Sequence, residues 1–85
     1  MIHRLKTLSQ FYQPVIDGSK PFEIRENDRG FQTGDSVILN EWDGEKYTGR
    51  FCLLLIRDIF DISFLLSGYV AFTFKLLNYF EEIKK

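Results

Sequence analysis

The chain combines two hydrophobic periods. Apolar residues two positions apart, as at Phe22 and Ile24, predict half-buried strands, whereas an apolar stripe that begins at Phe11 predicts a short helix. The run from Phe51 to Ile56 is apolar on both faces, which is typical of a central strand covered by another element. The predicted strands are residues 2–6, 20–26, 36–42, 47–58 and 69–76, and the predicted helices are residues 9–17 and 77–85.

The segments between these elements carry turn residues. Residues 27–30 and 31–35 predict two successive turns, and Asp43-Gly44 predicts a hairpin because this pair accepts positive φ. Gly18 predicts the end of the first helix, and residues 61–68 predict a loop or a short helical turn. The order predicts an α+β, mostly β fold: a small β-barrel of about five strands with one or two short helices, one of them plugging an end.

The composition of the chain limits the classes of function that it can have. The length of 85 residues predicts one domain, and a net charge of −1 lacks the basic excess of a sequence-blind nucleic-acid binder. Lys and Arg are most frequent in residues 1–30, so a nucleic-acid site would be a local cluster. One Cys and one His exclude an internal disulfide and a Cys/His zinc site, and we expect no metal and no cofactor. The sequence shows neither a signal peptide nor a membrane span, so we expect a cytoplasmic protein.

Residues 18–25 fit the pattern Gly-x-Lys-x-x-Glu-x-Arg. Flanking runs fit in order: His-x-Leu-Lys at 3–6, Asn-Asp-Arg at 27–29, Phe-x-x-Gly-Asp at 31–35 and Glu-Trp-Asp at 41–43. Over roughly residues 1–75, the chain resembles a stand-alone activating signal cointegrator homology (ASCH) domain of the pseudouridine-synthase-and-archaeosine-transglycosylase-like (PUA-like) class. Residues 76–85, which contain the helix predicted at 77–85, lie outside this pattern.

The resemblance implies a PUA-like barrel that binds RNA or a nucleotide in a cleft between the helix and the Glu-x-Arg strand. At the motif's own positions, Lys20 and Arg25 would meet a phosphate, and Glu23 would orient one of them. From the residues alone, an ion pair on a solvated face remains open, because Glu23 and Arg25 share one face of a strand about 6.6 Å apart.

The candidate ligand-binding residues are His3, Lys6, Lys20, Glu23, Arg25, Arg29 and Trp42. We expect His3 and Lys6 to reach the same cleft from the first strand, although a lone His is more often an ordinary surface or half-buried residue. Arg29 would form a wall of the cleft unless it merely completes the turn. Trp42, with Tyr69 as a second choice, would offer a stacking surface, and packing in the barrel is the alternative for both.

Binding is favoured over catalysis. Some relatives of the implied fold hydrolyse acylated cytidines with a Lys, a Thr three residues later and a distant Glu. Lys20 matches, but Glu23 stands in the place of the Thr. An acid–base pair of Lys20 and Glu23 keeps a small amidohydrolase of acylated nucleosides as an alternative. A second alternative is a protein-interaction adaptor, with a homodimer formed through the apolar C-terminal segment that contains Leu77, Phe80 and Ile83. A membrane partner is not expected, because a short helix with a narrow apolar side binds lipid poorly.

Overall fold

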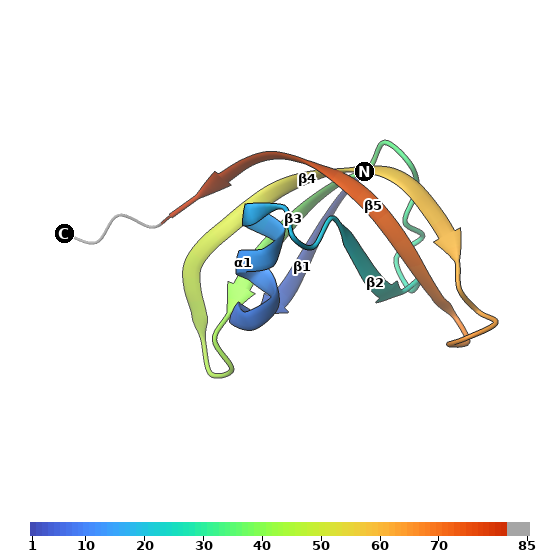
Figure 1. The fold of residues 1–85 in the computed structure, drawn as a ribbon, viewed down its shortest axis with the longest axis horizontal. Helices are drawn as coiled ribbons and strands as arrows, with labels where there is room; N and C mark the ends of the chain where they lie inside the picture. Colours follow the sequence, from blue (N-terminus) through green and yellow to red (C-terminus); the bar gives the residue numbers. More distant parts are fainter. Residues whose placement is uncertain (82–85) are drawn as a thin grey trace.

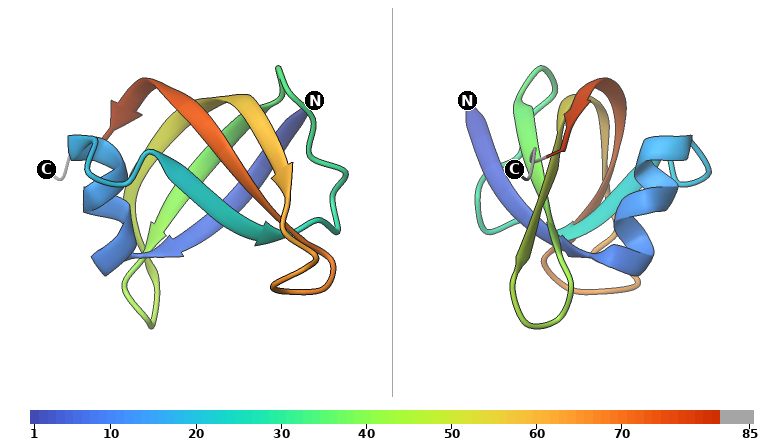
Figure 2. Two further views of the ribbon diagram at one scale, coloured as in Figure 1. Left: turned by 45° about the vertical axis from the view of Figure 1, so that its right-hand side comes forward. Right: turned by 90° about the vertical axis from the view of Figure 1, so that its left-hand side faces the viewer.

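A computed structural model describes residues 1–81 of the chain. Five strands form one sheet that arches over a single short helix (Figure 1). The elements are β1 (Ile2–Leu8), α1 (Ser9–Asp17), β2 (Phe22–Glu26), β3 (Ser36–Trp42), β4 (Tyr47–Asp61) and β5 (Tyr69–Phe80). α1 and the loop between β4 and β5 lie at opposite ends of the sheet (Figure 2).

The strand order is β1-β3-β4-β5-β2. β1 runs parallel to β3, and all the other neighbouring strands are antiparallel. The pairing of β4 with β5 shifts register between Leu53 and Leu54 and again between Ile56 and Ile59. Such bulges bend a strand and increase its twist, so the sheet curls into a half-barrel. The first and last strands of the order, β1 and β2, are therefore the two edges of this open form.

The core fills the concave side of the sheet. Tyr12 and Val15 are the buried residues of α1, and they pack with inward-facing residues of the central strands such as Leu39, Cys52 and Phe72. Alternate residues of β3 are fully or largely buried, as the period of two predicts. Gly18 ends α1 in the left-handed conformation at φ 86°, which favours glycine.

The structure confirms an α+β, mostly β fold with five strands and a helix at residues 9–17. The two long strands extend further than predicted, to residues 61 and 80. The predicted helix 77–85 is wrong for residues 77–81: residues 77–80 continue β5, in which 78–80 pair with Phe51 to Leu53 of β4, and residue 81 is not helical. The predicted helix also includes residues 82–85, which contain Ile83. These residues lie outside the part of the chain that the structure describes. No helix within residues 1–81 is both long and apolar enough to cross a membrane.

Candidate functional site

β2 turns its charged face toward the interior of the half-barrel. The Glu23 side chain is 4% exposed, whereas Phe22 and Ile24 are 42% and 47% exposed. The sequence predicted which of these residues share a face, but a strand normally buries its apolar face. Buried charge needs partners to offset its desolvation, so this inverted strand marks a polar site.

A cleft of about 610 Å³ lies along the open side of the half-barrel. Its walls come from both edge strands, from α1 and from the segment that follows β2. The lining residues are Leu5, Thr7, Phe11, Lys20, Phe22, Glu23, Ile24, Arg25, Glu26, Asp28, Arg29, Phe31 and Tyr69. Pockets of this size are typical of small-molecule sites.

One buried carboxylate holds two cations in this cleft. The Lys20 ammonium donates to Oε1 of Glu23 at 2.7 Å, and Nε of Arg25 donates to Oε2 at 3.2 Å. Arg25 also donates from Nη2 to the backbone carbonyl of Lys6 at 3.0 Å, which ties β2 to β1 across the open side. Both cations keep some solvent exposure, at 21% and 24% of their side chains. A buried anion therefore fixes two cations whose outer surfaces face the cleft.

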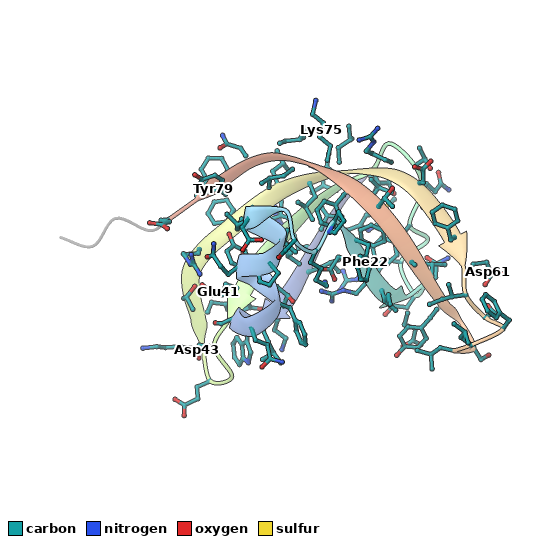
Figure 3. The ribbon with its side chains drawn as sticks, viewed as in Figure 1. Phe22, Glu41, Asp43, Asp61, Lys75 and Tyr79 are labelled. Atoms are coloured by element: carbon teal, nitrogen blue, oxygen red, sulfur yellow. The ribbon has the colours of Figure 1, made fainter. Side chains whose placement is uncertain are left out.

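Lys20 reaches this position because the chain reverses after α1. The turn at Gly18 brings the Lys20 amide back to donate to the Pro14 carbonyl at 3.0 Å. The Lys20 ammonium then lies 5.9 Å from the centre of the Phe11 ring and 5.6 Å from the centre of the Phe22 ring. Figure 3 labels Phe22 at β2.

The opposite wall is built on Phe31. Its amide donates to the Asn27 side-chain oxygen at 2.9 Å, and its ring packs 4.7 Å from that of His3 and 5.3 Å from that of Phe72. Nε2 of His3 lies 2.8 Å from a carboxylate oxygen of Asp35, and this hydrogen bond lowers the pKa of Asp35. His3 therefore supports the cleft wall from behind.

The structure brings four of the predicted ligand residues together, namely Lys20, Glu23, Arg25 and Arg29. Arg29 is 48% exposed, and its Nε lies 3.9 Å from Oδ1 of Asp28, a weak pair on the rim.

Three predicted residues do not line the cleft. His3 is buried behind Phe31, and the Lys6 ammonium lies outside, 4.6 Å from the centre of the Trp42 ring. Trp42 packs edge-on against Tyr47, whereas Tyr69, the second choice as a stacking surface, lines the cleft.

Sequence reasoning missed Thr7, Phe11 and Phe22 as lining residues. Phe11 and Phe22 looked like ordinary members of apolar stripes. The available signal was indirect: if Glu23 and Arg25 serve a site inside the sheet, Phe22 must be exposed beside it.

A second buried carboxylate, Glu41, was also missed. Arg50 donates to both of its oxygens at 2.8 and 2.9 Å, and the Thr48 hydroxyl adds a third hydrogen bond at 2.6 Å. These bonds, chiefly those of Arg50, lower the pKa of Glu41 to about 2. Nη1 of Arg50 donates to Gln13 of α1 at 3.2 Å, and the guanidinium lies 5.0 Å from the Tyr12 ring. All three guanidinium nitrogens have partners, so this cluster joins α1 to the sheet.

We also considered a reactive thiol and a metal site among residues 1–81. Cys52 is fully buried, and burial raises the pKa of its thiol to about 12, so it remains protonated and unreactive. Within residues 1–81, no three His, Cys, Asp or Glu side chains gather in a way that could hold a metal ion.

Fold and site together define a small α+β half-barrel with a charged cleft on its open side. The chain belongs to the family described as "Domain of unknown function (DUF3850)", whose model matches residues 2–74. It is similar to the "Uncharacterized 12.9 kDa protein in GpA 3'region" of Escherichia phage P2, with 38% identity over 69 residues. That match covers 81% of this chain and 63% of the phage protein, so the chain spans less than two thirds of this relative.

Proposed function

We propose that this protein binds RNA or a nucleotide, with a phosphate recognised by Lys20 and Arg25 in the cleft. The supporting observation is the inverted strand β2, which places one buried carboxylate between two partly exposed cations. Nη1 of Arg25 has no hydrogen-bonding partner among residues 1–81. It is free to donate to a phosphate oxygen in the plane of the guanidinium.

Glu23 supports this function by holding both cations in place before a ligand arrives. Its two oxygens each accept one bond, so the side chains of Lys20 and Arg25 lose less conformational freedom on binding. The similarity of residues 18–25 to the ASCH motif supports the same proposal, because these cations occupy the motif's own positions.

The test is a titration of the protein with short single-stranded RNA and with mononucleotides. In the variant Lys20→Gln with Arg25→Gln, the amides can still donate to Glu23, so the carboxylate keeps partners while both positive charges are lost. We expect affinity to fall at least about tenfold, because hydrogen bonds to charged groups contribute about 1.5–3 kcal/mol each.

The matched control replaces a Lys and an Arg outside the cleft, Lys46→Gln with Arg57→Gln. Both residues are exposed, and this variant has the same change in net charge. Equal affinities for the cleft variant and the control variant, with both folded by circular dichroism, would refute the proposal.

A further inference from the structure

The cleft has more aromatic surface at its mouth than a phosphate site requires. Phe11 and Phe22 are 43% and 42% exposed, and both line the cleft. The Lys20 ammonium lies within 6 Å of both ring centres, a distance at which a cation and a ring attract each other. Two partly free aromatic faces therefore flank the cation that we assign to phosphate.

The charge of the cleft gives a second reason to look beyond phosphate. Its three cations, Lys20, Arg25 and Arg29, are balanced by the three carboxylates of Glu23, Glu26 and Asp28. A cleft without net charge gains little from long-range attraction of a polyanion. Useful affinity for a nucleotide then needs a contribution that does not depend on charge, and stacking of a base on an aromatic ring supplies about 1–3 kcal/mol per base.

We propose that Phe11 and Phe22 form a stacking site for a nucleobase, so that the cleft takes one nucleotide with its phosphate at Lys20 and Arg25. This inference rests on the proposed function and names its ligand class. A cleft of about 610 Å³ accommodates one nucleotide. The base and the phosphate of one nucleotide then contact adjacent groups, because the Lys20 ammonium lies beside both rings.

The test compares ligands with and without a base. The four ribonucleoside 5′-monophosphates, ribose 5-phosphate and a trinucleotide RNA are titrated by calorimetry against the full chain. We expect at least one mononucleotide to bind tenfold or more tightly than ribose 5-phosphate. A gain of less than tenfold from the mononucleotide to the trinucleotide points to a free nucleotide, and a larger gain points to a nucleotide within RNA. Either result supports the stacking site.

The variants Phe11→Leu and Phe22→Leu keep an apolar side chain but remove the ring. We expect each to weaken mononucleotide binding about 5-fold to 150-fold, in line with the stacking energy, and to leave ribose 5-phosphate binding unchanged. Phe64→Leu is the matched control, because Phe64 is 81% exposed and lies outside the cleft lining.

The two proposals fail in different ways. If ribose 5-phosphate binds as tightly as every mononucleotide, or if Phe11→Leu and Phe22→Leu both behave like Phe64→Leu, the stacking site is refuted. The phosphate function still stands in that case, provided that the Lys20→Gln with Arg25→Gln variant has lost affinity. If neither nucleotides nor RNA bind, both proposals are refuted.

Discussion

Glu23 and Glu41 are both carboxylates buried in the half-barrel and paired with an arginine. The two ion-pair clusters differ in how many guanidinium nitrogens are left without a hydrogen-bonding partner. Figure 3 labels Glu41 on one side of α1 and Phe22, the neighbour of Glu23, on the other. Arg50 uses all three of its nitrogens on protein groups, two of them on Glu41. Arg25 gives Glu23 one hydrogen bond and keeps Nη1 without a partner among residues 1–81.

This difference shows that a buried ion pair alone does not identify a binding site. The Glu41 cluster has the stronger geometry, and its hydrogen bonds lower the pKa of Glu41 to about 2, as expected for a structural tie. The Glu23 cluster has weaker geometry, a guanidinium nitrogen without a partner among residues 1–81 and a large adjacent cleft. Unused donors beside open volume distinguish the candidate site from the structural pair.

The largest expected effect is on stability. Arg50→Ala leaves Glu41 buried without its main partner and should lower the free energy of unfolding by about 3–5 kcal/mol. Arg25→Ala should cost about 1–2 kcal/mol, because Lys20 and water in the cleft still solvate Glu23. Urea unfolding measures both, and Arg57→Ala should change stability by less than about 0.5 kcal/mol. If the losses for Arg25→Ala and Arg50→Ala are equal, the two clusters do not differ as described.

The next effect is a pH dependence of stability. The pKa of Glu41 is about 2 in the folded protein against 4.5 in its ordinary state, so its stabilisation is complete above pH 4.5 and is lost as the pH falls toward 2. This shift corresponds to at most about 3 kcal/mol. Urea unfolding between pH 5 and pH 2 should show this decline, and Glu41→Gln should flatten part of it. Asp35, whose pKa is also lowered, contributes to the slope that remains. An unchanged slope in Glu41→Gln would contradict the assignment.

The smallest expected effect is that of salt on RNA binding. The cleft lining is balanced in charge, and one or two phosphate contacts give a shallow slope of log affinity against log salt. Affinity for a short single strand should fall less than about tenfold between 50 and 200 mM salt. Fluorescence anisotropy at several salt concentrations measures this slope. A much steeper slope would mean that many phosphates bind outside the Glu23 cluster.

The sequence predicts most of the fold because the relevant signals are local. The period of two defines β3, and Gly18 defines the end of α1. The end of β5 was mispredicted because Leu77 and Phe80 have helical spacing. In the structure Phe80 instead pairs with β4, where its ring stacks on that of Phe51 at 4.9 Å between centroids. A pairing across such a sequence distance leaves no local pattern.

The sequence predicts only part of the site, because only some of its features are encoded locally. The motif locates Lys20, Glu23 and Arg25, and alternation on one strand places Glu23 and Arg25 on the same face. The same alternation places His3 and Lys6 on opposite faces of β1, so they cannot both face one cleft. Which face of β2 points inward depends on how the sheet curls, and no residue of β2 encodes this alone.

The inward charges of β2 also bear on solubility. An edge strand offers unpaired backbone groups to any extended chain, and inward-pointing charges are one means by which proteins prevent such aggregation. Glu23 and Arg25 lie on an edge strand whose other face is apolar at Phe22 and Ile24. An uncharged, apolar inner face would make this strand hydrophobic on both sides, as in segments that form fibrils. The residues proposed to serve a ligand thus also place charge on an edge strand, a feature that opposes strand-to-strand aggregation.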